Sequence, residues 1–425
     1  MADFRFIHAA DLHLESPYQG LHRLDEELGK ALVRRGRKAF EHLIGACLEE
    51  KVDFLLLAGD TFDSAAVSLG AQAHFYEGLR KLREGGITVY LICGNHDPFD
   101  HWSKGFRLPD NVHRFPAGSV ERRVFSRGGK DLAAVYGVSF GQREEYQNFA
   151  VDFRKEPGDP FAIGLLHGAV SGNKDHEPYC PFSLEDLRRA GMDYWALGHI
   201  HKAEVLQEVE PRMVYPGNLQ GRHFKETGPK GAELVEVSGQ HLTAHRFLPL
   251  AEVEFRTARL DLNGVEDESG LFDRLRQLRE TLLGEGRSVL LRLQVTGQTP
   301  LFFRLSEERQ VEALRESFQE LNDYESRFIY LEGLDNQTTP PIDLTARQKG
   351  DDFVGELLRH FAELENGEES LGELLEELAG EIRASSIAGV LPEGEGALLK
   401  DPHSLLERAR GLALRGLLKE VGDEN

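Results

Sequence analysis

Short apolar runs alternate with longer amphipathic stretches over the first 200 residues of this chain. The apolar runs predict six buried strands at 4–9, 53–58, 87–93, 132–138, 161–167 and 193–199. Between them, apolar side chains at helical spacing predict one helix through Leu32 and Cys47 and a second whose buried face begins at Leu69. Alternating strands and helices predict an α/β fold, here a layered sandwich.

The pattern changes to strands and turns near Met213, and we expect these strands to complete the same sheets. Residues 1–250 would then form one domain. Residues 251–340 alternate strand, helix, strand, helix and strand, which predicts a small α/β domain that ends in a proline-containing linker at 334–344. Residues 341–425 show amphipathic helical periodicity without strand signals and predict a helical tail.

The composition excludes several protein classes. Of the 425 residues, 40% are apolar and 29% charged, and no uncharged apolar run is long enough to span a membrane. The first residues lack the features of a secretion signal. Three cysteines are too few for a disulfide framework or a cysteine-based zinc site. We therefore expect a soluble cytoplasmic protein with no membrane association.

The negative charge is concentrated in the second half of the chain. The net charge is −22; residues 1–250 hold 30 basic and 35 acidic residues, a net of −5, so residues 251–425 carry −17. Such a protein repels polyanions as a whole. A polyanionic substrate would have to meet a local basic patch or metal ions that neutralise carboxylates.

Five short motifs that carry possible ligands follow predicted strands. They are Asp11-Leu12-His13, Gly59-Asp60, Gly94-Asn95-His96-Asp97, His167-Gly168 and Gly198-His199-Ile200-His201. Loops at the carboxyl ends of strands in an α/β sheet converge on one crevice, so these motifs can meet in space. One such motif alone is most often a turn or a helix cap, whereas five in succession indicate a shared site.

The ligand types indicate a pair of metal ions. Carboxylate, imidazole and amide ligands without thiolate suit Mn²⁺, Fe²⁺ or Zn²⁺. Seven ligands with one shared carboxylate can hold two ions about 3.5–4 Å apart, the arrangement that serves phosphoryl transfer. We expect Asp60 to be the bridge, since an acidic bridge offsets the repulsion between two dications.

These motifs resemble those of the calcineurin-like metallophosphoesterase superfamily, and within it the DNA double-strand-break repair exonucleases of the SbcD and YhaO type. Stretches beyond the metal motifs support the second resemblance, namely HAADLHLESPYQGL, GNKDHEPYCPFSLEDL and YPGNLQGRHFKETGPKG. The resemblance implies a two-sheet metallophosphoesterase sandwich with a small α/β capping domain and a C-terminal helical tail.

The resemblance also implies roles for individual residues. One ion would be bound by Asp11, His13, Asp60 and His201, and the other by Asp60, Asn95, His167 and His199. His96 would contact the scissile phosphate and protonate the leaving oxygen without binding metal. Related nucleases carry a histidine three residues after the bridging aspartate; here Asp63 occupies that place, and we expect it to orient a neighbouring side chain. Asp97 would fix the tautomer of His96.

Two loops hold further candidates for contact with substrate. His176 lies in the loop after the fourth motif, and His223 follows the fifth. Arg222, Lys225 and Lys230 give the second loop a local positive charge that could contact phosphate. The alternative for each histidine is an ordinary loop residue.

The C-terminal tail permits two interpretations. Residues 351–425 hold 7 basic and 18 acidic residues, which is typical of a solvated face. An apolar stripe nevertheless runs along Phe353, Leu357, Leu358, Phe361 and Leu364, and it must pack on something. The family resemblance implies an SMC-like ATPase partner of the SbcC or YhaN type, and a homodimer.

We therefore predict a manganese-type two-metal DNA nuclease that acts on DNA ends in repair, as an exonuclease and, secondarily, an endonuclease. One alternative is a phosphoesterase for cyclic nucleotides, other small diesters or phosphoproteins, because the same metal motifs would serve it. The other is a non-catalytic scaffold for DNA or an ATPase. The complete set of expected ligands argues against the scaffold.

Overall fold

The computed structural model describes residues 3–14, 26–63, 67–102, 107–172, 177–341 and 344–367, with short helical pieces between 371 and 414. The candidate His176 lies outside these residues. The chain divides into two compact units. The first comprises Met1–Arg256, Glu285–Leu290 and Asp323–Phe328, and the second comprises Thr257–Gly284, Leu291–Asn322 and Ile329–Asn425. The three-domain division expected from the sequence stays a prediction.

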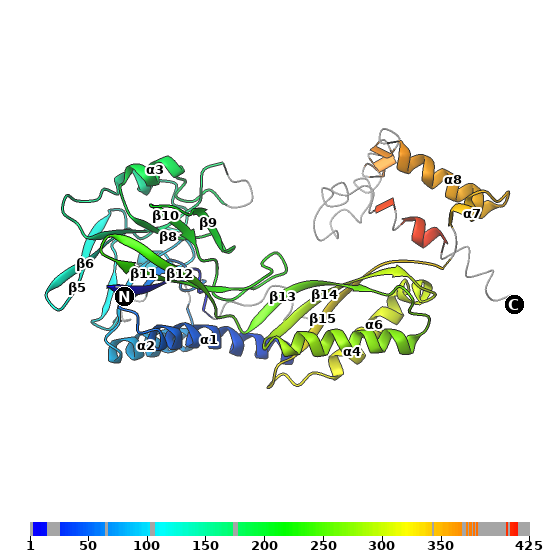
Figure 1. Ribbon diagram of the computed structural model, residues 1–425, viewed down its shortest axis with the longest axis horizontal. Helices are drawn as coiled ribbons and strands as arrows, with labels where there is room; N and C mark the ends of the chain where they lie inside the picture. The colour runs from blue at the N-terminus through cyan, green and yellow to red at the C-terminus, as the bar shows by residue number, and fades with distance from the viewer. Residues whose placement is uncertain are drawn as a thin grey trace. The chain divides into compact units, whose positions relative to one another are not determined.

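The first unit contains two six-stranded sheets (Figure 1). The first sheet has the order β12-β11-β1-β2-β3-β4. Its strands are β1 (Phe4–Ala9), β2 (Phe54–Ala58), β3 (Thr88–Ile92), β4 (Val112–Arg114), β11 (Gly231–Ser238) and β12 (His241–Pro249). Strands β1 to β4 are parallel, so their carboxyl ends lie at one edge, whereas β11 pairs antiparallel with β1 and β12.

The second sheet has the order β5-β6-β7-β8-β10-β9. Its strands are β5 (Glu121–Arg127), β6 (Lys130–Gly137), β7 (Phe161–His167), β8 (Tyr194–Gly198), β9 (Glu204–Gln207) and β10 (Arg212–Tyr215). The four central strands are parallel, and antiparallel β5 and β9 form the edges. This sheet therefore also presents several carboxyl strand ends at one edge.

Helices cover the outer faces of both sheets (Figure 1). Helices α1 (Glu26–Glu49) and α2 (Leu69–Glu84) pack on the first sheet, and α3 (Leu184–Arg189) packs on the second. In β1, Ile7 faces the helices while Phe4 and Phe6 face the other sheet. Both faces of the central strands are thus buried, which is why their sequences are continuously apolar. The predicted two-sheet α/β sandwich is confirmed.

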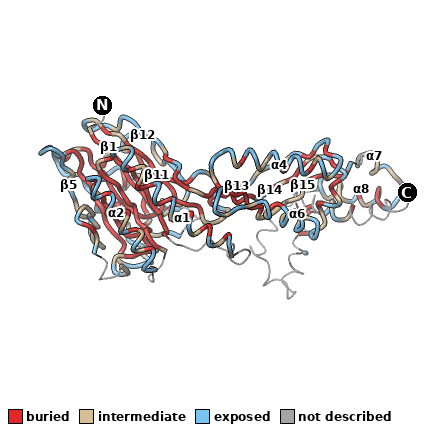
Figure 2. The backbone as a smooth tube through the Cα atoms, turned by 90° about the horizontal axis from the view of Figure 1, so that it is seen from below, coloured by how far each residue is buried: buried red, intermediate tan, exposed pale blue. Residues whose placement is uncertain are grey.

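Two details of the predicted elements differ from the structure. Strand β5 was not expected, because it has no buried residue and its sequence carries no apolar alternation (Figure 2). Leu69 was expected on the buried face of α2, yet it is 83% exposed. It begins the helix directly after the cap residue Ser68, one turn before the buried face that includes Phe75.

The second unit holds most of a three-stranded sheet of order β13-β14-β15. Its elements are β13 (Val253–Asp261), α4 (Glu268–Gly284), β14 (Ser288–Gln298), α5 (Phe302–Leu305), α6 (Glu308–Glu320) and β15 (Ile329–Thr339). The order matches the prediction. The predicted linker at 334–344 is wrong in its first half, because β15 continues through Thr339.

The tail contains α7 (Leu344–Gln348) and α8 (Phe353–Asn366). Val354 and Leu358 of α8 pack against Leu414, while Phe361 and Leu364 pack against a cluster of leucines from later in the tail. The apolar stripe is therefore partly covered by the tail itself, although Phe353 is 64% exposed. None of the helices described has the length and apolarity needed to cross a membrane.

Candidate metal centre

The predicted ligands lie at the carboxyl ends of five strands. Asp11 and His13 follow β1, Asp60 follows β2, Asn95 follows β3, His167 ends β7, and His199 and His201 follow β8. All are buried or half-buried. The contacts given below bring the seven side chains together, although they come from two sheets.

The backbone around these side chains is unusual. In the described part of the chain, six non-glycine residues have positive φ angles, and four of these are Asp11, His13, Asp60 and His199, with φ of 52°, 42°, 52° and 98°. Such conformations cost energy and cluster at functional sites. Gly94 is also constrained, because a Cβ there would lie 2.3 Å from Oδ1 of Asp60. Local strain is therefore tolerated where the ligands must converge.

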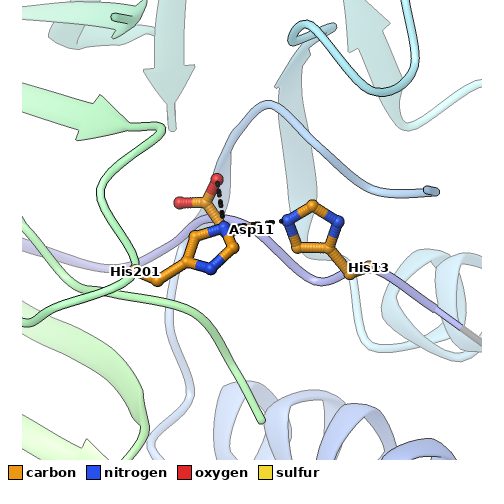
Figure 3. A group of neighbouring side chains, drawn as sticks. All are labelled: Asp11, His13 and His201. Carbon is orange, nitrogen blue, oxygen red and sulfur yellow. Dashed lines mark hydrogen bonds and ion pairs between the residues drawn. The ribbon is translucent and has the colours of Figure 1, made fainter. Parts of the chain in front are cut away.

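Asp11, His13 and His201 form the first group of possible ligands (Figure 3). The Nε2 atoms of His13 and His201 lie 3.1 Å apart, and His201 Nε2 lies 4.0 Å from Oδ1 of Asp11. Asp11 and His13 are buried. Two imidazole nitrogens and a carboxylate thus converge on one point.

Asn95, His167 and His199 form the second group. Oδ1 of Asn95 lies 2.9 Å from Nε2 of His167 and 3.1 Å from Nδ1 of His199. Asp60 lies between the two groups: its Oδ2 is 3.8 Å from Nε2 of His13 and 3.5 Å from Nε2 of His167. A carboxylate in this position can contact an ion in either group.

Each of the four histidines has its other ring nitrogen bound to an oxygen. The pairs are His13 Nδ1 with Asp63 at 3.2 Å, His201 Nδ1 with Glu226 at 2.5 Å, His167 Nδ1 with the Ala58 carbonyl at 2.8 Å, and His199 Nε2 with the Glu177 carbonyl at 3.0 Å. Carbonyl and carboxylate oxygens accept hydrogen bonds, so these nitrogens carry the N–H. In the neutral rings the opposite nitrogen keeps its lone pair for a metal ion. The donor set therefore fits a pair of divalent ions.

The electrostatics of the centre favour positive charge. Burial disfavours the charged form of His167, but the carboxylates of Asp60 and Asp11 outweigh burial and raise the pKa of His167 to about 9. Burial likewise opposes ionisation of Asp60, yet His167 and the neighbouring histidines lower its pKa below the usual value. The same attraction would hold metal ions.

His96 lies beside this centre and contacts Asp63. Its Nδ1 is 2.7 Å from Oδ1 of Asp63, and Oδ2 of Asp63 accepts a 3.0 Å hydrogen bond from Arg222. Burial lowers the pKa of His96, but Asp63 and Asp60 more than compensate, and the net shift is upward. No other hydrogen bond to the His96 ring occurs among the residues described, so Nε2 is available to another group.

Asp97 does not hold His96, contrary to our expectation. Its carboxylate accepts hydrogen bonds from the backbone N–H groups of Gly94 at 2.9 Å, Asp60 at 3.2 Å and Thr61 at 2.9 Å. Burial and the nearby Asp60 charge raise the pKa of Asp97 to about 7, although these amides lower it. Asp97 thus joins the loops after β2 and β3, and Asp63 orients His96 instead.

The basic loop after β10 is largely turned inward. Nζ of Lys230 is buried and donates to the backbone carbonyl of His201 at 2.7 Å, so the expected phosphate contact by Lys230 is wrong. His223 faces Glu226, with Nε2 3.3 Å from Oε1. Lys225 is exposed. Glu226 was not among the expected site residues; an acid among basic residues was the one available sign.

The sequence and structure agree with comparisons to known proteins. The calcineurin-like phosphoesterase family matches residues 4–203, and the middle domain of the metallophosphoesterase YhaO matches residues 255–339. The uncharacterized metallophosphoesterase YhaO of Bacillus subtilis is 39% identical over 345 residues, which cover 81% of this chain and 84% of that protein. The chain belongs to the calcineurin-like metallophosphoesterase family. The family resemblance inferred from the motifs is thus confirmed.

More distant relatives of this metallophosphoesterase have names that refer to nucleases and DNA repair. The DNA double-strand break repair protein Mre11 of Methanocaldococcus jannaschii is 26% identical over 257 residues, covering 56% of this chain. The SbcD component of the nuclease SbcCD of Bacillus subtilis is 24% identical over 262 residues, covering 53% of this chain. The matched regions span 63% of the length of each of these two relatives.

Proposed function

We propose that this metallophosphoesterase is a two-metal DNA nuclease that hydrolyses phosphodiester bonds at DNA ends in repair. The observation that carries the proposal is Asp60, whose Oδ2 lies within 3.8 Å of a histidine nitrogen from each ligand group. The printed names of the Mre11 and SbcD relatives support DNA as the substrate.

Two groups of residues would hold the ions. Asp11, His13, Asp60 and His201 would bind one, and Asp60, Asn95, His167 and His199 the other. We propose Mn²⁺, with Fe²⁺ and Zn²⁺ as the other candidates, because mixed imidazole and oxygen donors suit these ions. Bound ions would supply Lewis acidity and a hydroxide nucleophile at neutral pH.

The proton for the leaving group would come from His96. Asp63 accepts the Nδ1–H of this ring and stabilises its protonated form, so a proton at Nε2 can be passed to the departing sugar oxygen. Arg222 contacts the far oxygen of Asp63 and keeps that carboxylate in place. The exposed Lys225 could contact the phosphate backbone.

The remaining parts of the chain would serve substrate and partner binding. We propose that residues 251–340 guide duplex DNA to the centre, that the chain forms a homodimer, and that the tail binds an SMC-like ATPase of the SbcC or YhaN type. Phe353 and Leu412 support the last point, because these large apolar side chains are 64% and 58% exposed.

The test is an assay of purified protein with end-labelled duplex DNA and with bis-p-nitrophenyl phosphate, each with Mn²⁺ and with EDTA. Asp60→Asn is the control for contaminating nucleases. We expect metal-dependent shortening of the DNA that this variant lacks. Hydrolysis of the small diester alone would favour a small-substrate phosphoesterase, and inactivity on both substrates would favour a scaffold.

A further inference from the structure

We infer that Glu226 is a positioning residue that holds His201 in the orientation needed to bind the first ion. The inference rests on the proposed function, because it concerns the same pair of ions. Glu226 lies 25 residues after His201 and belongs to none of the five ligand motifs. Its contacts distinguish it from the other acidic residues of the chain.

The Glu226 carboxylate is 6% exposed and is surrounded by hydrogen-bond donors. Oε1 accepts from Nδ1 of His201 at 2.5 Å, and Oε2 accepts from Nδ2 of Asn218 at 2.9 Å and from the backbone N–H of Arg222 at 2.7 Å. An ionised carboxylate satisfies all of these groups, because it is acceptor-only. A glutamine would place its own NH₂ group against one of the donors.

The same segment also holds the backbone around His201. The N–H of Asn218 donates to the His201 carbonyl at 3.2 Å, and Nζ of Lys230 donates to the same oxygen at 2.7 Å. Gly217 comes so close that a Cβ would lie 2.8 Å from this oxygen. With the backbone of His201 fixed in this way, rotation of the imidazole ring is the freedom that Glu226 removes.

Ring rotation decides whether His201 can act as a ligand. A half-turn about the bond to the ring exchanges Nε2 with a carbon atom, and the other tautomer places the N–H at Nε2, so either change removes the lone pair directed at the ion. The hydrogen bond from Nδ1 to Glu226 excludes both. Glu226 therefore contributes to metal binding through His201 without contacting the ion.

The two ion sites differ in this respect. In the second group, backbone carbonyls of Ala58 and Glu177 hold His167 and His199, so loss of the Glu226 carboxylate leaves these rings in place. We therefore expect Glu226 to affect one ion and spare the other. A residue needed only for folding would affect both.

The experiment is a Mn²⁺ titration followed by electron paramagnetic resonance of the unbound ion. It compares the wild-type protein, Glu226→Gln and Glu204→Gln, a matched charge change at an exposed residue of β9 that follows His201 closely in the chain. Glu226→Gln should weaken one of two bound ions about 10–100-fold, which is typical for loss of a partner of a ligand. The second ion, and both ions in Glu204→Gln, should keep wild-type affinity.

Two results would overturn the inference. One is wild-type affinity for both ions in Glu226→Gln; the other is equal weakening of both ions with a lower thermal midpoint in EDTA, which would make Glu226 a folding residue. If Glu226→Gln does not fold, Glu226→Asp replaces it, since its carboxylate is retained but withdrawn from His201. Selective weakening of one ion is again expected, and equal affinity for both ions at wild-type strength would contradict it. Because binding is measured without DNA, failure of the nuclease assay would leave this result interpretable.

Discussion

The Nε2 atoms of His13 and His201 lie 3.1 Å apart, and each ring donates its Nδ1–H to a different carboxylate, Asp63 and Glu226. Neutral rings so arranged direct two lone pairs at one another. Such an arrangement is unfavourable unless a cation lies between the nitrogens. The folded chain is thus built around positive charge at this point.

The first prediction is that metal ions stabilise the fold. An ion that binds the folded chain at about 100 times its dissociation constant adds about 2.7 kcal/mol to the free energy of unfolding. Mn²⁺ should therefore raise the thermal midpoint above its value in EDTA, and Ca²⁺ should raise it less, because it prefers oxygen ligands. Calorimetry of the protein with each ion is the measurement. An unchanged midpoint with Mn²⁺ would show that no such site forms.

The second prediction separates metal binding from proton transfer. Asp60→Asn should weaken both ions, because Asp60 contacts both ligand groups. His96→Ala should retain two ions and lose about 10²–10⁴-fold in turnover, the typical effect of losing a general acid. Metal analysis after dialysis, together with kcat for both variants, tests this. Loss of metal in His96→Ala with retention in Asp60→Asn would reverse the two assignments.

A third prediction concerns Asp63, which orients His96 through a 2.7 Å contact. Asp63→Asn should lower the rate on DNA more than the rate on bis-p-nitrophenyl phosphate, because a nitrophenolate departs without a proton whereas a sugar oxygen needs one. Part of the loss is shared by both substrates, since Asp63 also contacts His13. The ratio of the two kcat/KM values is therefore the quantity to measure, and an unchanged ratio would remove His96 and Asp63 from proton transfer.

The central strands and the ligands could be predicted for a common physical reason. Strands such as β7 are buried on both faces and are therefore continuously apolar in sequence. Their carboxyl ends meet at one edge, so polar residues directly after them predict a site. Strand β5 escaped prediction because it is a partly exposed edge strand whose sequence includes three arginines.

The groups that orient the ligands were harder to predict. The oxygen that holds His199 is the backbone carbonyl of Glu177, and every residue type offers such a carbonyl. Glu226 reaches His201 through a loop whose path the local sequence does not determine. Asp97 was assigned to His96 because the two are adjacent in sequence, but it binds backbone amides in two loops.

The fourth prediction is a pH dependence of stability from His8. This ring is fully buried, with hydrogen bonds to Tyr194 and the Leu197 carbonyl, and burial lowers its pKa from 6.5 to about 3. Between these values the unfolded chain binds a proton that folded His8 does not, so stability is present above pH 6.5 and is lost as pH falls.

The slope from one such group is at most about 1.4 kcal/mol per pH unit. His8→Gln, measured by urea unfolding in EDTA, should show a shallower decline than wild type between about pH 7 and pH 5.5. Parallel declines in the two proteins would mean that His8 does not contribute.

The fifth prediction concerns the tail and its proposed ATPase partner. Phe353→Glu should abolish binding of the ATPase in a pull-down while the tail stays folded, because this side chain is 64% exposed. Phe361→Glu should also disturb the packing of the tail, since Phe361 contacts its leucine cluster. A chain truncated after Pro340 should lose ATPase binding and keep hydrolysis of small diesters. Equal binding by all four proteins would show that the tail is only a solvated appendage.

The most direct test of the two-ion centre is anomalous diffraction at the manganese absorption edge from crystals soaked in Mn²⁺. We expect two peaks about 3.5–4 Å apart, one on either side of Asp60. One peak should be within bonding distance of Asp11, His13 and His201, and the other of Asn95, His167 and His199. A single peak, or a peak bound by Asp63 and His96 instead, would contradict the proposed centre.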